Sequence, residues 1–283
     1  MGRVRYPAVA GFFYEGDPDA LKRRIEWCFK HKLGPGSIPS VGEKGERKII
    51  GLVSPHAGYM YSGPVAAHSY GELAKDGKPD VVIILGPNHT GMGSGVSIVD
   101  SGSWRTPLGS VEINSEIARR IVKNSEVIAV DDLAHEQEHS IEVQLPFLQY
   151  IYGNEFTFVP ICMMLQMKDI CIDVGNAIAK AIRDVNAVVI ASTDFTHYEP
   201  YDKAYNKDGK VLKAIESLDP ELMLKLVDSI PVSMCGPGPV AAMLYAAKQL
   251  GATKATILKY ATSGDVTGDK FSVVGYGSVK IEK

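Results

Sequence analysis

Residues 49–58 (IIGLVSPHAG), 81–91 (VVIILGPNHTG) and 187–197 (AVVIASTDFTH) share one pattern, an apolar run that leads into a polar turn with a histidine. Each run is short, rich in Val and Ile, and bounded by Gly, Pro or polar residues, which is typical of a buried β-strand. Ligands of open α/β sheets bind beyond the carboxyl ends of the strands. If these strands share one sheet, His56, His89, Asp194 and His197 converge at that edge.

Strand-like and helical segments alternate along the rest of the chain. The patterns predict strands at 48–54, 80–86, 156–161, 187–193, 255–261 and 271–282, a β excursion around Trp104, and helices at 18–31, 63–75, 114–123, 137–151, 168–184, 207–217, 219–228 and 239–250. This alternation predicts an α/β fold with a mainly parallel central sheet covered by helices on both faces. There is no internal repeat or break in composition, so we expect a single domain over residues 1–283.

Composition excludes several classes of protein. The 283 residues are 45% hydrophobic and 22% charged, as in ordinary globular proteins. A net charge of −3 provides no broad basic field for nucleic acid. No stretch is long and apolar enough to span a bilayer, and Pro7, Glu15 and Asp17 interrupt any signal-peptide core. We therefore expect a cytoplasmic protein without a nucleic-acid or membrane partner.

The four cysteines are too scattered to form a disulfide framework. Cys28, Cys162 and Cys171 fall in apolar helix or strand patterns and read as small core residues. Cys235 differs because it precedes a Gly-Pro turn that opens a helix. The positive end of a helix favours thiolate, the form that binds metal or acts as a nucleophile.

Residues 136–149 (EQEHSIEVQLPFLQ) have the polar and apolar faces of a helix. His139 and Glu142 are three residues apart, so on a helix they share one face. They could both point into the crevice, or the face could be a solvated helix edge.

Three kinds of chemistry remain open from these residues alone. Two histidines and a carboxylate suit Fe(II) and dioxygen, whereas two histidines and a thiolate favour zinc or copper. A metal-free alternative is acyl transfer by Cys235, with Asp194 orienting His197 as the base, but it leaves the other two histidines unexplained. The third is a protein that binds a small molecule or peptide without turnover in a cleft lined by aromatic residues, namely Tyr59, Tyr61, Trp104, Phe195 and Tyr198.

Six motifs in this order resemble the Memo family, whose prokaryotic members are often labelled AmmeMemoRadiSam system protein B. They are AGFFYEGDPDAL, SPHAGYMYSG, LGPNHTG, EHSIEVQLPFLQ, STDFTHY and the late Cys-Gly turn, and together they span nearly the whole chain. The family is similar in fold to class III extradiol ring-cleavage dioxygenases, which hold Fe(II) with two His and one Glu and use a further His as acid and base.

The resemblance implies a role for four residues. His56 and His89 match the two histidine ligands, and His197 matches the acid–base histidine. Cys235 stands where the dioxygenases place the carboxylate ligand. A thiolate donates more charge and is itself oxidisable, so this departure separates the chain from ring-cleavage chemistry.

These observations predict a metal-dependent oxidoreductase that acts on a small aromatic or redox-active substrate. The expected metal is iron or copper, with zinc as an alternative, held by His56, His89 and Cys235, with Asp194 and His197 as orienting and proton-transfer groups. The alternative is a non-enzymatic metal-binding or partner-binding protein that uses the same cleft. The residues expected around the metal or in the cleft are His139, Glu142, Tyr59 and Phe195.

Overall fold

The three predicted histidine-bearing strands lie side by side in the sheet of the computed structural model, which describes residues 3–42 and 47–283. They are β2 (Ile49–Ser54), β3 (Val81–Pro87) and β9 (Ala187–Ser192). Strand β9 pairs in parallel with both neighbours, giving the order β3-β9-β2. The carboxyl ends of all three strands therefore meet at one edge of the sheet, as the sequence predicted.

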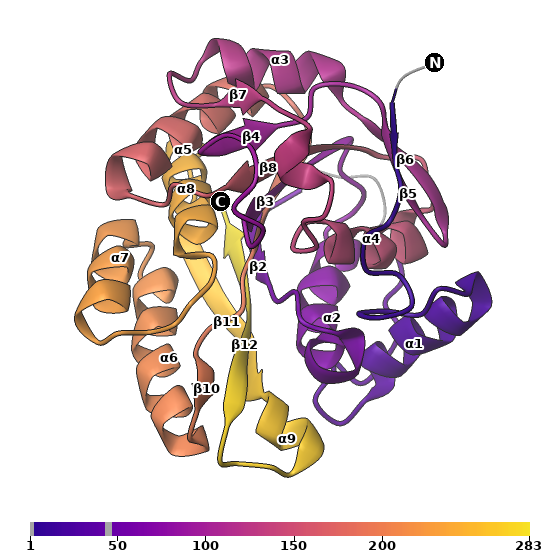
Figure 1. Cartoon of the computed structure of the whole chain (residues 1–283), viewed down its shortest axis with the longest axis vertical. Helices are drawn as coiled ribbons and strands as arrows, with labels where there is room; N and C mark the ends of the chain where they lie inside the picture. Colours follow the sequence, from indigo (N-terminus) through magenta and orange to yellow (C-terminus); the bar gives the residue numbers. More distant parts are fainter. Residues whose placement is uncertain (1–2, 43–46) are drawn as a thin grey trace.

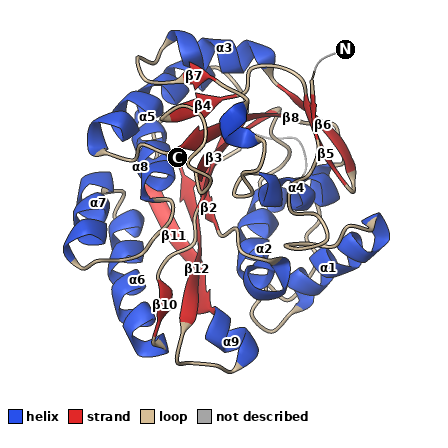
Figure 2. Cartoon of the chain, viewed as in Figure 1, coloured by secondary structure: helices blue, strands red, loops and turns tan. Residues whose placement is uncertain are grey.

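The remaining elements extend this sheet and cover it (Figures 1 and 2). The other strands are β1 (Val4–Arg5), β4 (Val96–Ile98), β5 (Ser103–Thr106), β6 (Gly109–Ile113), β7 (Ala129–Val130), β8 (Thr157–Met163), β10 (His197–Glu199), β11 (Lys254–Thr262) and β12 (Val273–Glu282). The helices are α1 (Pro18–Lys30), α2 (Tyr59–Lys75), α3 (Ser115–Lys123), α4 (Leu145–Tyr152), α5 (Lys168–Ile182), α6 (Tyr201–Glu216), α7 (Pro220–Ser229), α8 (Pro237–Gln249) and α9 (Ser263–Thr267). Two 3₁₀ turns cover Leu133–His135 and Glu142–Gln144.

The centre of the sheet is parallel, and antiparallel pairs lie on both sides of it. The main path runs β1-β5-β6-β8-β3-β9-β2-β12-β10, and its central run from β6 to β2 is parallel. Strand β12 is antiparallel to β2 and pairs with β11 in a long hairpin. The α/β fold with a mainly parallel sheet is confirmed.

Alternate side chains of the central strands enter two different cores. In β3, Val82 and Ile84 pack under α1, α2 and α4, whereas Ile83 and Leu85 pack under α3, α5, α7 and α8. This period of two is what a strand buried on both faces requires. Helices therefore cover both faces, as predicted, and Figure 1 shows the two groups on either side of the sheet.

Most element boundaries match the sequence prediction, and three helices begin several residues away from their predicted starts. The predicted start of the helix at 137–151 is wrong, because regular helix begins only at Leu145 after a 3₁₀ turn. Helix α2 begins at Tyr59 and α6 at Tyr201, both earlier than predicted. Cys28, Cys162 and Cys171 are buried, as expected for core residues. Within residues 3–42 and 47–283, none of the helices combines the length and apolar character that crossing a membrane requires.

Candidate metal centre

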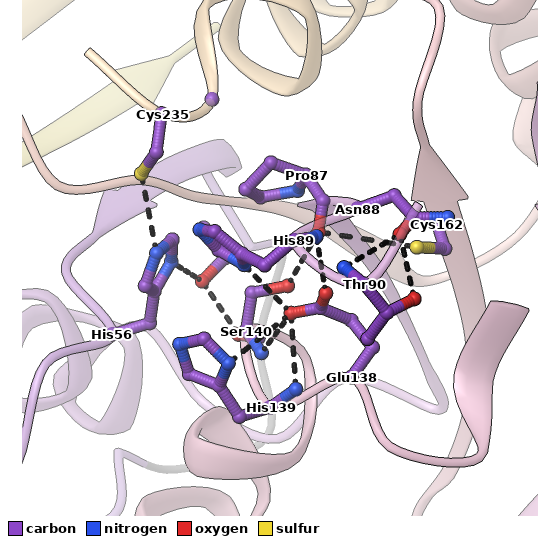
Figure 3. A network of polar contacts seen from close by, with 12 residues as sticks. His56, Pro87, Asn88, His89, Thr90, Glu138, His139, Ser140, Cys162 and Cys235 are labelled. Atoms are coloured by element: carbon purple, nitrogen blue, oxygen red, sulfur yellow. Dashed lines mark hydrogen bonds and ion pairs between the residues drawn. The ribbon is translucent and has the colours of Figure 1, made fainter. Parts of the chain in front are cut away.

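Two of the strands place their histidines at the same offset beyond the sheet edge. His56 lies two residues after β2 and His89 two residues after β3, and Asp194 occupies the same position after β9. Because the three strands are parallel neighbours, these turns meet above the carboxyl edge. A third histidine, His139, reaches the same place from the segment before α4 (Figure 3).

His56, His89 and His139 form a compact cluster that could hold a metal ion. Their candidate ligand atoms all lie within 4.8 Å of one another. The ring centroids are 5.2 Å apart for His56 and His89, and 4.6 Å apart for His89 and His139, whose rings are stacked. Nitrogen ligands of a tetrahedral ion, with bonds of about 2.1 Å, lie about 3.4 Å apart. Small rotations of the imidazole rings therefore bring three nitrogens to coordination distance.

Glu138 is the buried carboxylate that arranges two of these histidines (Figure 3). Its Oε1 accepts from His89 Nδ1 at 2.9 Å and from the backbone N–H groups of His139 at 3.0 Å and Ser140 at 2.9 Å. Its Oε2 accepts from the backbone N–H of His89 at 2.6 Å. Burial alone would raise the pKa of Glu138, but the hydrogen bonds from His89 and from the backbone N–H groups lower it. The carboxylate holds a proton on His89 Nδ1 and leaves Nε2 facing the cluster.

Ser192 settles which nitrogen of His56 carries the proton. The Ser192 hydroxyl donates to the carbonyl oxygen of Ser140 at 2.6 Å. The same hydroxyl oxygen accepts from Gln144 Nε2 at 2.7 Å. A serine hydroxyl has only one hydrogen, so at its 2.9 Å contact with His56 Nδ1 the serine must accept. His56 therefore carries its proton on Nδ1, and its Nε2 has a free lone pair.

Two histidines of the cluster, His56 and His139, have lowered pKa values, which favours the neutral state that binds metal. Burial, reinforced by the neighbouring imidazoles of His139 and His89, holds the pKa of His56 well below its ordinary value. Burial also lowers the pKa of His139 to about 4. Metal ions bind the unprotonated nitrogen of imidazole, so these pKa shifts favour coordination at neutral pH.

Cys235 lies beside one histidine of the cluster and outside the group of three. Its Sγ is 3.2 Å from His56 Nε2, and the backbone N–H of Asp194 donates to it at 3.1 Å. A metal ion held by His56 could therefore also take the Cys235 sulfur as a ligand. The prediction that the helix terminus lowers the pKa of the thiol is wrong for this arrangement, because burial, reinforced by Asp194, raises it.

Asp194, the predicted orienting group, and His197, the predicted proton-transfer group, have separate partners. Asp194 Oδ1 accepts from the backbone N–H of His56 at 2.9 Å, and burial raises the pKa of Asp194 to about 6. His197 is partly exposed, and its Nδ1 lies 2.8 Å from the carbonyl oxygen of Ser233. The thiol of Cys235 faces His56, so these contacts do not assemble the Cys235–His197–Asp194 arrangement of an acyl transferase. The proton-transfer role of His197 stays a prediction.

Glu142 lies apart from His139 despite the predicted shared face. Its fully buried carboxylate pairs with Arg5 at 2.6 Å and accepts from Tyr14 Oη at 2.6 Å. The reason is local, because the Glu138 side chain takes the N–H groups of the next two residues and competes with helix formation. Glu142 therefore anchors the N-terminal segment.

The two aromatic residues predicted near the site occupy different surroundings. Tyr59 donates its hydroxyl to the carbonyl oxygen of Val143 at 2.6 Å and lines a cavity of about 140 Å³. Phe13 lines the same cavity, and its ring lies 4.7 Å from that of His139. Phe195 is fully buried and packs against Tyr260.

Sequence reasoning missed Glu138 and Ser192. Glu138 precedes His139 directly, and a carboxylate next to a candidate ligand was the available signal. Ser192 ends an apolar strand and gave no signal of its own. His139 was named only as a neighbour of the metal.

The fold and the histidine cluster define a class of α/β proteins with a candidate metal centre at the carboxyl edge of a parallel sheet. The family model described as Memo-like protein matches residues 5–280. The chain is 54% identical to a MEMO1 family protein of Methanopyrus kandleri, over 97% of this chain and 98% of that one. It is 55% identical to one of Methanothermobacter thermautotrophicus, over 96% and 98%. The chain belongs to the Memo family.

A solved structure of low sequence identity shares the fold. The crystal structure of uncharacterized protein JW3007 from Escherichia coli K12 superposes with a TM-score of 0.54 at 16% identity. The match covers 82% of this chain and 99% of the other. The similarity shows the common architecture alone.

Proposed function

We propose that the protein is a metal-dependent oxidoreductase whose centre is built on His56, His89 and His139. The observation that carries the proposal is the convergence of three imidazoles whose ligand atoms lie within 4.8 Å of one another. A buried carboxylate that orients histidine ligands is a recurrent companion of metal sites, and Glu138 provides it. The donor set thus fits a transition metal.

The choice of metal depends on whether the thiol joins the imidazoles. Three imidazoles suit zinc, copper or iron, and added thiolate strengthens the preference for copper or zinc. Iron or copper fits a redox role, since zinc has no redox chemistry. A bound iron or copper ion would supply one-electron chemistry with dioxygen or peroxide.

The surroundings favour a small substrate. The cavity lined by Phe13 and Tyr59 has a volume of about 140 Å³, close to that of a pocket of about 150 Å³ that accommodates one benzene ring. Phe13 lines this cavity and its ring contacts the His139 ring, so a small aromatic molecule there would be one side chain away from the centre. His197, partly exposed and held through Nδ1, is the group we assign to proton transfer at its other nitrogen.

Metal analysis of the protein and its variants tests the proposal. We expect one iron or copper ion per chain after reconstitution, and at least a tenfold loss of affinity in each of His56→Ala, His89→Ala and His139→Ala. His31→Ala, which changes a histidine packed on Trp27, is the matched control and should retain the metal. Absence of bound metal under reducing, metal-replete conditions would refute the proposal.

Turnover separates the two functional classes. A metal-loaded protein that consumes dioxygen or peroxide with a phenolic or other reducing substrate supports the oxidoreductase. Stoichiometric metal without turnover over a panel of such substrates would favour the non-enzymatic metal-binding protein.

A further inference from the structure

Three tyrosine rings lie in a row between the site and the molecular surface. Tyr260 of β11 and Tyr205 of α6 have ring centroids 4.8 Å apart, and Tyr205 and Tyr201 have centroids 4.5 Å apart. The inner end of the row reaches Phe195, whose ring lies 6.4 Å from that of Tyr260. Phe195 follows Asp194, whose backbone N–H donates to Cys235 Sγ. The aromatic row therefore connects the loop after β9, which contacts Cys235, to α6.

Every tyrosine in this row donates its hydroxyl to a carboxylate. Tyr260 donates to Asp208 Oδ2 at 2.5 Å. Tyr205 and Tyr201 donate to the two oxygens of Asp265, each at 3.0 Å. A phenol that loses an electron becomes strongly acidic, so its oxidation at neutral pH requires a base that takes the proton at the same time. A carboxylate within hydrogen-bond distance is such a base.

Asp208 is a buried carboxylate that no cation neutralises among the ion pairs of the described residues. Its remaining partner is Thr196 in the loop after β9, where Oγ1 donates to Oδ1 at 2.6 Å and the backbone N–H lies 3.2 Å and 3.3 Å from the two carboxylate oxygens. A buried carboxylate without a counter-charge is costly, and burial raises the pKa of Asp208 and thus its strength as a base. Burying the Asp208 carboxylate beside Tyr260 therefore costs free energy that an apolar side chain at this position would not cost.

Strand β12 leaves room for this pair. A Cβ at Gly275 would lie 2.1 Å from Asp208 Oδ2 and 2.7 Å from Tyr260 Oη. The absence of a side chain there lets the carboxylate and the phenol meet against the strand.

We propose that Tyr260, Tyr205 and Tyr201 carry single electrons between the metal centre and the surface of α6. The inference rests on the proposed redox function and adds a route for its electrons. With a peroxide as the oxidant at the centre, two phenols and one hydrogen peroxide give two phenoxyl radicals and two water molecules. Each phenol O–H bond breaks, the proton passes to the carboxylate and then to solvent, and the electron passes to the centre. The peroxide O–O bond breaks, and solvent supplies two protons to the waters.

The three tyrosine rings differ in solvent exposure and in nearby charge, and therefore in how easily each is oxidised or reduced. Tyr205 is 36% exposed, so a one-electron donor in solution, such as a phenol or a thiol, can reduce its radical. Tyr201 lies under the ammonium of Lys270, at 4.4 Å from the ring centroid. This positive charge makes electron removal from Tyr201 harder, so the radical rests on Tyr205 and Tyr260.

Freeze-quench electron paramagnetic resonance tests the route in metal-loaded protein mixed with hydrogen peroxide. We expect a tyrosyl radical whose yield falls at least fivefold in Tyr260→Phe and in Asp208→Asn. Asparagine at position 208 keeps a hydrogen-bond acceptor for Tyr260 or Thr196 but is not a base. If Asp208 had a purely structural role, this substitution would lower the melting temperature and leave the radical yield unchanged. Tyr152→Phe is the control, because the Tyr152 hydroxyl donates to two backbone carbonyls. Equal yields in Tyr260→Phe and Tyr152→Phe would overturn the route.

A second arm is independent of the bound metal. Flash oxidation with a ruthenium polypyridyl complex and persulfate removes an electron from exposed phenols in the metal-free protein. We expect the long-lived radical to fall at least fivefold in the Tyr205→Phe, Tyr260→Phe double variant relative to Tyr152→Phe. If metal binds and this ratio is one, the route is overturned while the proposed function stands. If no metal binds, the proposed function fails and the link between the tyrosines and a centre fails with it.

Discussion

At the scale of single residues, Glu138 determines the geometry of the candidate centre. One carboxylate accepts two hydrogen bonds from His89, through Nδ1 and the backbone N–H, and one from the backbone of His139. Both histidine-bearing segments are thereby tied to one buried point. An imidazole whose Nδ1 is fixed in this way presents Nε2 in one direction, which reduces the entropy that a metal ion must overcome on binding.

Replacing Glu138 by Gln should weaken metal binding by about 10- to 100-fold. Glutamine has nearly the same shape, but its amide nitrogen cannot accept the hydrogen bonds that both carboxylate oxygens accept now. Competitive titration with a chromophoric chelator measures the loss. Glu136→Gln, two residues earlier and paired with Arg3 at the surface, should bind metal like the parent. Unchanged affinity in Glu138→Gln would show that the backbone alone positions the histidines.

The sequence identified single site residues where the pattern was local. His56 and His89 could be predicted because each follows an apolar strand by a fixed offset. Glu138 and Ser192 could not, because their roles depend on partners far away in the chain, such as the 52 positions between Ser192 and the carbonyl of Ser140. The predicted ligand Cys235 does approach the cluster, but whether it binds the metal stays a prediction.

At the scale of elements, α1 and α2 approach so closely that a glycine is required between them. A Cβ at Gly63 of α2 would lie 2.4 Å from Sγ of the buried Cys28 in α1. Eight residues further along α2, a Cβ at Gly71 would meet its nearest neighbours at 3.8 Å, an ordinary van der Waals distance. Helix α2 therefore has no room for a side chain at Gly63 and has room for one at Gly71.

Gly63→Ala should destabilise the protein by about 1–3 kcal/mol, because the methyl group overpacks the contact between the two helices. Gly71→Ala should instead stabilise it by about 0.5–1 kcal/mol, since alanine loses less backbone entropy in a helix. Urea unfolding followed by circular dichroism measures both changes. Equal effects of the two substitutions would contradict the close approach of α1 and α2.

The predicted helices and strands are correct where hydrophobic periodicity determines the structure. They are wrong where a side chain accepts the hydrogen bonds of backbone N–H groups. The strands at the sheet centre lie within two residues of their predicted ends. The stretch 136–149 has the periodicity of a helix, yet hydrogen bonds from residues 139 and 140 to the Glu138 side chain delay the helix until Leu145. Such competition depends on burial of the carboxylate, which periodicity does not reveal.

At the scale of the whole molecule, one buried carboxylate, that of Glu142, binds four groups of the N-terminal segment. Glu142 accepts from Arg5, from the backbone N–H groups of Ala8 and Val9, and from Tyr14 Oη. These partners are 128 to 137 positions away in the chain. The segment that they hold carries Phe13 to the ring of His139, so the anchor also shapes the candidate centre.

Glu142→Ala should lower the free energy of unfolding by about 3–5 kcal/mol, since it leaves the buried guanidinium of Arg5 without its counter-charge. Amide hydrogen exchange should rise first in residues 5–14. Glu155→Ala, which removes an exposed partner of Lys78, should change stability little. Protection of residues 5–14 equal to that of the parent would show that packing alone holds the segment.

The proton arrangement around Ser192 has a consequence for what a metal ion displaces. Folding fixes a proton on Nδ1 of His56, and burial holds the pKa of this imidazole well below its ordinary value, so Nε2 already carries a lone pair. An ion that binds this nitrogen drives no proton into solution. Burial raises the pKa of the Cys235 thiol, so sulfur would become a thiolate ligand only by releasing its proton. At a pH below the range in which metal-bound water ionises, the acid released on binding would therefore report whether Cys235 has become a ligand.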